Sequence, residues 1–363
     1  MITRRALIAL SIVASAIALG CDDSSGPEDR IVAGVNMTEL FAPPSAAEIN
    51  AILAEWSTRD VSAQNVQVIV DAPLTLNTVD TRLRVVTHDV GDVTHYGAVL
   101  VPDGAQPGSL PVLMYLHGGD HGENLDVLLP LLPVVLGDDL ANFIFVAPSF
   151  RSERLVYDGI RYDSDGPPSP WDRDVDDALA LLNVTLDIAP EADADRIALL
   201  GFSRGAGVAL LMAERDPRID IVVEFFGPTD LFDPFIQGIV EEALLGELRD
   251  LPGLTHLDSV YIEPLQRGEL TIADVRPELV RRSSVLFAER LPQLQIHHGI
   301  DDMTVEVSQA ESLIETMQEL GRGEPGFEFY LYDGGVHDPL TLPESIERTR
   351  DFLGRLLVAL AGV

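Results

Sequence analysis

Residues 195–207 read DRIALLGFSRGAG, and this segment decides the fold of the chain. A short apolar run enters a Gly-x-Ser-x-Gly pentapeptide centred on Ser203, and residues 208–214 then have the composition of a helix. A strand, a tight turn and a helix form the setting that raises a serine hydroxyl above the end of a sheet. The flanking Gly201 and Gly205 suit such a turn, because side chains there would clash with a strained backbone.

Ser203 has two interpretations at this place. In the first, it is a nucleophile, and the unpaired N–H groups at the start of the following helix stabilise an oxyanion. In the second, it caps the helix after an ordinary glycine-rich turn. The pentapeptide alone does not separate them, so the rest of the chain has to supply an acid, a base and a second oxyanion donor.

The composition of the 363-residue chain restricts its chemistry. Its length suits one large α/β domain with an N-terminal extension, or two small domains. Acidic residues outnumber basic ones by 59 to 24, and the net charge of −35 argues against a nucleic-acid partner. We attribute the acidity to solubility or a salt-rich medium, the alternative being a docking face for a cationic partner. All 24 basic residues are arginines, which excludes lysine-dependent catalysis, and a base for Ser203 has to be one of the eight histidines.

The N-terminus has the pattern of an export signal. Arg4 and Arg5 precede an apolar run at 6–19, which is short for a membrane span. The single cysteine, Cys21, stands where a bacterial lipoprotein carries its lipid, and this resemblance implies cleavage before Cys21 and its lipidation; plain secretion is the alternative. We therefore expect a signal peptide at 1–20 and a flexible tether at 21–35, with a membrane contact only through Cys21.

The remaining pattern predicts an α/β fold with a mostly parallel central sheet flanked by helices. Three β-rich segments form an antiparallel start, and short apolar strands then alternate with helices. We expect an N-terminal extension at 36–80, with helices in 31–59, and a catalytic domain at 81–363 that carries a helical cap at about 231–290. The predicted strands are 66–70, 81–88, 94–101, 112–116, 142–147, 196–200, 219–226, 293–298 and 327–332, and the later helices are 171–186, 305–320 and 344–360.

An acid and a histidine follow the serine on two successive loops. Asp301 and Asp302 come after one predicted strand, and His337 comes after the next. Serine, aspartate and histidine in this order are typical of the α/β-hydrolase fold. In the corresponding mechanism His337 takes the proton of Ser203, and Asp302, with Asp301 as its rival, orients the imidazole.

The oxyanion hole is predicted from two backbone segments. One N–H group comes from Arg204, directly after the nucleophile, and a second from Gly119 or Asp120 in a His-Gly-Gly-Asp turn after an early strand. The other histidines are expected to be structural, or to lie on strands or the surface; they include His88, His95, His117 and His121.

Taken in order, these motifs resemble the α/β-hydrolase superfamily and, within it, the prolyl-oligopeptidase-like branch, which grades into dienelactone hydrolases and acetyl xylan esterases. The resemblance covers residues 82–363 and implies that Asp302, four residues after His298, is the acid. Glu306 departs from the proline that is frequent there, and the chain has no propeller repeat, so esters and peptides remain equally open as substrates. The segments on which the resemblance to this superfamily rests are Trp171-Asp172-x-Asp174-x-Asp176-Asp177, Asp195-Arg196-Ile197, Gly201–Gly205, Gly227-Pro228-Thr229-Asp230, His298-Gly299-x-x-Asp302-x-x-Val305 and His337.

The sequence thus predicts a secreted serine hydrolase that cleaves an ester or a short amide through an acyl-enzyme on Ser203, with no cofactor and no metal. The alternative is a non-enzymatic surface lipoprotein that uses the same fold as a binding module.

Overall fold

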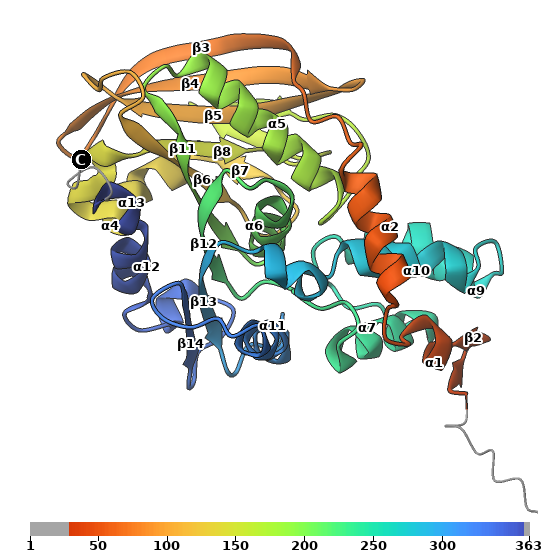
Figure 1. Cartoon of the computed structure of the whole chain (residues 1–363). Helices are drawn as coiled ribbons and strands as arrows, with labels where there is room; N and C mark the ends of the chain where they lie inside the picture. Colours follow the sequence, from red (N-terminus) through yellow and green to blue (C-terminus); the bar gives the residue numbers. More distant parts are fainter. Residues whose placement is uncertain (1–28, 359–363) are drawn as a thin grey trace, which may run out of the picture.

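The computed structural model describes residues 29–358, so the predicted signal peptide and Cys21 lie outside the described residues. A sheet of nine strands forms the centre of the molecule (Figure 1), and β7, β9 and β10 form a small second sheet. The strands are β1 (Ile31–Val32), β2 (Val35–Asn36), β3 (Gln64–Leu76), β4 (Val79–Val90), β5 (Val93–Pro102), β6 (Leu110–Leu116), β7 (Glu123–Asn124), β8 (Ile144–Pro148), β9 (Arg154–Tyr157), β10 (Ile160–Asp163), β11 (Ala192–Phe202), β12 (Ile219–Phe225), β13 (Gln293–Gly299) and β14 (Phe327–Tyr332).

The helices include short 3-10 segments and one π-helical turn, η3. They are α1 (Met37–Leu40), α2 (Ala46–Trp56), α3 (Leu125–Leu128), η1 (Leu129–Leu131), α4 (Leu132–Leu136), η2 (Gly137–Asn142), α5 (Arg173–Ile188), α6 (Arg204–Arg215), α7 (Pro234–Leu244), α8 (Leu254–Leu257), η3 (Asp258–Ile262), α9 (Glu263–Gln266), α10 (Ile272–Arg281), η4 (Ser284–Arg290), α11 (Ser308–Glu319), η5 (Pro339–Thr341), α12 (Ser345–Leu353) and α13 (Arg355–Val358). Within residues 29–358, none of them combines the length and the apolar character needed to cross a bilayer.

The large sheet has the order β14-β13-β12-β11-β6-β8-β5-β4-β3. Neighbouring strands are parallel from β14 to β8, and β5, β4 and β3 continue the sheet in antiparallel pairs. The predicted mostly parallel sheet is therefore confirmed. The chain goes from β6 to β8 on one side and returns to β11 on the other, which places a topological switch point between β6 and β11.

Helices cover both faces of the sheet, because the buried strands are apolar on both sides. Along β11, Ile197 and Leu199 pack toward α2, α5, α6 and α11, while Ala198 and Leu200 pack toward α3, α4 and α12. The two resulting cores hold the sheet edge that carries Ser203 in a fixed position.

The N-terminal part differs from its prediction in two places. Residues 31–36, expected to be helical, form the short β1–β2 hairpin, in which Ala33 and Gly34 adopt positive φ angles. Strand β3, which falls in the predicted extension 36–80, pairs with β4 and is the edge strand of the central sheet. Within the range 31–59, where helices were predicted, α2 is present, and the side chain of Ser45 closes a capping box at its start.

The predicted cap, residues 231–290, folds mainly into helices α7 to α10. They share a small core with the start of the chain, where Leu40 and Phe41 of the α1 region pack among cap residues such as Val240 and Val275. Figure 1 shows α2 beside α10 and α1 near α7, at the end of the molecule away from β3. The segment from β1 to α1 is thus a structural part of the cap.

Candidate active site

Ser203 follows β11 directly and occupies a strained turn. Its φ and ψ angles of 52° and −119° are unusual for a residue with a side chain. It stands at the N-cap position of α6, but its hydroxyl makes no capping hydrogen bond. The geometry therefore disfavours the capping interpretation and leaves the hydroxyl available for chemistry.

The two glycines of the pentapeptide are required by close packing. A Cβ atom on Gly201 would lie 2.5 Å from the carbonyl oxygen of Gly205, and one on Gly205 would overlap the carbonyl of Leu116 at the end of β6. No ordinary side chain fits at either position without moving the backbone. The turn is consequently held between its own helix and the neighbouring strand.

The carboxyl ends of the parallel strands bring the candidate residues to one edge of the sheet. Gly201 on β11 is in register with Leu116 on β6, and Gly299 on β13 is in register with Tyr332 on β14. The loops that follow these strands hold Ser203, the His-Gly-Gly-Asp turn, Asp302 and His337. This edge, at a switch point, is where open α/β sheets bind their ligands.

Asp302 and His337 form a direct pair. Nδ1 of His337 lies 2.6 Å from Oδ2 of Asp302, and Oδ1 of Asp302 accepts the backbone N–H groups of Thr304, at 2.8 Å, and Val305, at 3.1 Å. Burial alone would raise the pKa of Asp302, but the hydrogen bond and charge of His337 and these N–H groups outweigh it and lower the pKa. Asp301 is exposed, so the geometry selects Asp302 over its rival.

His337 is positioned by an aromatic contact as well. Its ring centroid lies 4.3 Å from that of Phe226, a residue with a positive φ angle of 43° directly after β12. Because Asp302 holds Nδ1, Nε2 is the nitrogen left to act on Ser203. Within residues 29–358, no hydrogen bond joins Ser203 to His337, although both follow strands at the same edge of the sheet.

The predicted oxyanion loop lies against Ser203. A Cβ atom on Gly118 would come within 3.1 Å of the Ser203 Cβ atom, and Gly119 follows with a φ angle of 75°. Within the described range, the backbone N–H of Arg204, the first residue of α6, has no hydrogen-bond acceptor. Both expected backbone segments are therefore beside Ser203.

The side chain of Arg204 has a role that the sequence did not reveal. Its Nη2 lies 2.7 Å from Asp174 Oδ2, and its Nη1 pairs with Glu153. The same Nη1 donates a hydrogen bond to the Gly119 carbonyl at 3.2 Å. The side chains of Glu153, Asp174 and Arg204 are all buried. Nε2 of His117 lies 3.3 Å from Glu153. This group, which we call the Arg204 cluster (His117, Glu153, Asp174 and Arg204), ties α5, α6 and the oxyanion loop together.

Burial dominates the electrostatics of the Arg204 cluster. It raises the pKa of Glu153 to about 7 despite the nearby Arg204, and it raises the pKa of Asp174 as well. Burial also lowers the pKa of His117 to about 4, so this imidazole is neutral at pH 7. A neutral, buried His117 fits the structural role expected for it.

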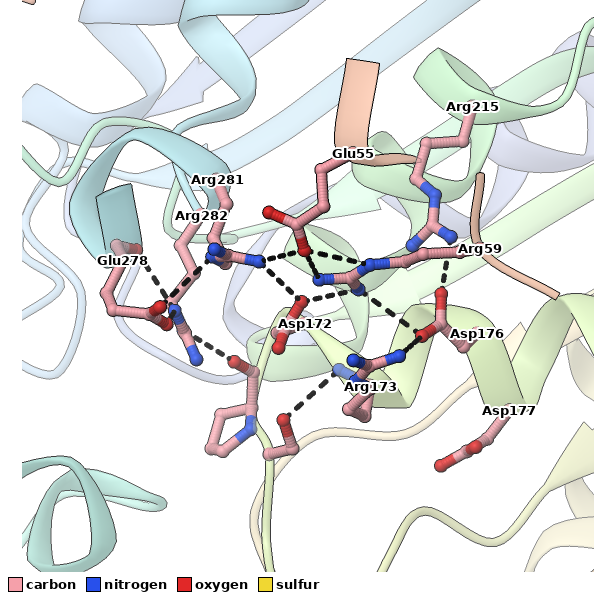
Figure 2. Close-up of polar contacts among 12 residues, drawn as sticks. Glu55, Arg59, Asp172, Arg173, Asp176, Asp177, Arg215, Glu278, Arg281 and Arg282 are labelled. Carbon is pink, nitrogen blue, oxygen red and sulfur yellow. Dashed lines mark hydrogen bonds and ion pairs between the residues drawn. The ribbon is translucent and has the colours of Figure 1, made fainter. Parts of the chain in front are cut away.

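A second ion network lies beyond the start of α5 (Figure 2). Asp172 and Asp176 at the start of this helix are paired with an arginine: Arg59 Nη1 lies 2.6 Å from Asp172 and 3.3 Å from Asp176. Glu55 Oε1 of α2 lies 2.6 Å from Arg59 and 2.7 Å from Arg281 of α10. The network joins the start of the chain, the sheet-covering helix α5 and the cap.

A large, mainly apolar pocket opens beside Ser203; its empty space, counted together with the solvent at its open mouth, is about 1130 Å³. Ser203 and Arg204 lie at the sheet side, Leu40 and Phe41 contribute from the α1 region, and the cap supplies most of the remaining wall. The cap and α1 residues in the wall include Phe235, Ile236, Ile239, Val240, Leu254, Leu257, Tyr261, Ile262, Leu265, Val275 and Leu279. Concave sites with a mainly apolar wall and a few polar groups are typical of small-molecule binding.

The remaining histidines do not approach Ser203 through any hydrogen bond in the described part of the chain. His88 and His95 are strand residues, as expected, and are buried, as are His297 and His298; His121 is exposed. Among residues 29–358, no group of three or more His, Cys, Asp or Glu side chains has an arrangement suited to a metal ion.

Comparisons with known proteins extend only to solved structures: no protein-family model and no curated protein matches the sequence. The acetyl xylan esterase from Paenibacillus sp. R4 is 19% identical, with a TM-score of 0.59 over 88% of this chain and 99% of that one. Acetyl xylan esterase 1 from Thermoanaerobacterium sp. JW/SL YS485 is 16% identical, with a TM-score of 0.57 over 85% and 92%. A puromycin-hydrolyzing peptidase of Mycobacterium tuberculosis is 16% identical, with a TM-score of 0.50, over 79% of this chain but 45% of that one. These likenesses show that the chain has the α/β-hydrolase fold, as predicted.

Proposed function

We propose that this protein is a serine hydrolase that forms an acyl-enzyme on Ser203. The observation that carries the proposal is that Ser203, which has a strained backbone and a hydroxyl that does not cap α6, lies at the same sheet edge as the Asp302–His337 pair. His337 accepts the Ser203 proton through Nε2 as the hydroxyl attacks a carbonyl, and Asp302 stabilises the resulting imidazolium. The N–H groups of Arg204 and of Gly119 or Asp120 stabilise the oxyanion, and water then releases the acyl group.

An ester is the better-supported substrate. The chain aligns with nearly the full length of two acetyl xylan esterases but with less than half of the puromycin-hydrolyzing peptidase. Ester cleavage also makes smaller demands on the general acid, because an alkoxide or phenoxide leaves more readily than an amine.

Labelling with a fluorophosphonate probe tests the nucleophile. We expect the folded wild type to be labelled on Ser203, and Ser203→Ala to lose labelling and to hydrolyse 4-nitrophenyl acetate about 10⁴-fold or more slowly. A matched control, Ser152→Ala, removes a serine of the same positive-φ type outside the site and should leave both readouts unchanged. A folded wild type that is not labelled would favour a binding protein with this fold.

We also propose that the chain is exported and anchored by lipid on Cys21, following the pattern of its first 21 residues. The mass of the mature N-terminal peptide tests this: a diacylglycerol-modified Cys21 supports the proposal, and an unmodified, uncleaved Met1 contradicts it.

A further inference from the structure

We propose that the pocket beside Ser203 binds the acyl part of the substrate, and that this acyl group is an apolar chain of medium length, well beyond acetyl. The inference rests on the proposed function and adds the class of substrate. It follows from three properties of the pocket: its apolar wall, the state of its few charged groups, and its position relative to Ser203 and His337.

The wall is built from separate parts of the chain that all contribute apolar side chains. Leu40 and Phe41 come from the α1 region, Ile239 from α7, Leu257 from α8 and Leu279 from α10. An acyl chain inside such a wall loses contact with water along its length, and each buried methylene contributes about 0.8 kcal/mol, or about fourfold in binding. An acetyl group is too short to reach the wall residues that α7, α8 and α10 contribute together, and would leave most of this apolar wall without a ligand.

The charged residues of the wall already have partners. Glu278 accepts hydrogen bonds from Arg282, at 2.5 Å, and from the Tyr261 hydroxyl, at 3.0 Å, and Arg282 also donates to the Pro170 carbonyl at 2.9 Å. Arg204 is engaged by the Arg204 cluster. A sugar or a charged peptide would have to give up water without finding free polar partners here, and this is unfavourable.

The position of the pocket distinguishes the acyl group from the leaving group. Ser203 and Arg204 line the pocket, whereas His337 is not among its wall residues. The general acid has to reach the oxygen of the leaving group, so the alcohol lies toward His337. The acyl chain, which extends from the carbonyl held at Arg204, is then directed into the pocket.

A series of 4-nitrophenyl esters tests the proposal. We expect kcat/KM of the wild type to rise at least tenfold from acetate to octanoate, with a limit of about fourfold for each added methylene. The series keeps the alcohol constant; a second series of acetate esters with alcohols of increasing length should show no such rise. A preference for acetate, or a dependence on the alcohol instead, would overturn the assignment.

Filling the pocket provides the matched comparison. Leu257→Trp places a large ring in the wall, and we expect the octanoate-to-acetate ratio of kcat/KM to fall at least tenfold. Val260→Trp is the control, because Val260 is exposed on the adjacent turn η3 and does not line the pocket; its ratio should equal that of the wild type. Ile236→Trp, from another part of the wall, replaces Leu257→Trp if thermal melting shows that the latter is unfolded.

Fluorophosphonate labelling of each protein tests the proposed function separately from the assignment of the pocket to the acyl group. If Ser203 is labelled but the ratio does not depend on acyl length or on Leu257→Trp, the assignment of the pocket is wrong and the proposed function stands. If Ser203 of the folded wild type is not labelled, the proposed function itself fails, and the pocket assignment fails with it.

Discussion

Two groups of side chains adjoin Ser203: the apolar pocket wall, and the Arg204 cluster, in which a guanidinium, two carboxylates and an imidazole are buried together. The pocket wall borders empty space, so its side chains can change size with limited effect on their neighbours. The charged members of the cluster, Glu153, Asp174 and Arg204, depend on one another, because the loss of the cation would leave buried carboxyl groups without their partner. Specificity is therefore expected to depend on the pocket wall, and stability on the Arg204 cluster.

The largest effect is expected from breaking the cluster. Arg204→Met keeps the backbone N–H of the proposed oxyanion hole but leaves Asp174 and Glu153 buried without their cation. We expect a loss of about 3–5 kcal/mol in the free energy of unfolding at pH 7, measured by urea denaturation. The loss should shrink at pH 5, where the carboxyl groups take up protons more easily. Arg204→Lys, which retains the charge, should lose less; equal losses would show that the charge is not the stabilising element.

The next effect concerns a buried carboxyl group that is not paired with a cation in the described part of the chain. Glu224 on β12 accepts the backbone N–H of Gly227 at 2.9 Å, and burial raises its pKa to about 8. The folded state therefore binds a proton that the unfolded state releases between pH 4.5 and about 8, and rising pH across this window destabilises the fold.

Glu224→Gln removes this titration while keeping an acceptor for Gly227. We expect the variant to be more stable than the wild type by up to about 3 kcal/mol at pH 7, and equally stable near pH 4.5, by urea denaturation at several pH values. A difference that does not vary with pH would contradict the raised pKa.

A smaller effect is expected in the pocket wall. Ile239→Ala should cost about 1 kcal/mol in the free energy of unfolding, because its side chain borders the open pocket and loses only part of its packing. Leu113→Ala, at a fully buried position between the sheet and its helices, should cost about 2–5 kcal/mol. Similar losses at both positions would mean that the wall is packed as tightly as the core.

The smallest effect is expected at the surface. Arg267 lies 3.0 Å from Glu263 and 2.8 Å from Glu269, and all three side chains are half-exposed. Arg267→Ala should leave the urea midpoint unchanged within error, with or without 1 M salt, because solvent weakens such pairs. A clear shift would show that surface pairs matter in this acidic chain.

The sequence was sufficient to predict the sheet and the candidate triad. The alternation of apolar strands and helices is a local pattern that can be recognised in the sequence alone. The same holds for the order of Ser203, Asp302 and His337 along the chain. The choice of Asp302 over Asp301 rested on the resemblance, and the hydrogen bond to His337 agrees with it.

Long-range contacts could not be predicted in the same way. The acidic run at 172–177 fits the dipole of a helix, and nothing local indicates that its partners are Arg59, Arg204 and Arg281. The β1–β2 hairpin was missed because two residues per strand are too few for a periodic signal. The sequence predicted a helical cap at about 231–290 but not which residues form the pocket wall, because these residues come from segments that are far apart in the chain.

The attachment of α2 to the cap has a kinetic consequence. Nε of Arg276 in α10 donates a hydrogen bond to Oε1 of Glu48 in α2 at 2.7 Å, although the two residues are 228 positions apart in the chain. Nη1 of Arg281 binds Oε1 of Glu55 in the same way. Helix α2 can form early, because its capping box is local, but its docking has to await a segment that lies far along the chain and to close a very long loop. The pocket, whose wall includes Leu40 and Phe41, is therefore complete only when this long loop has closed.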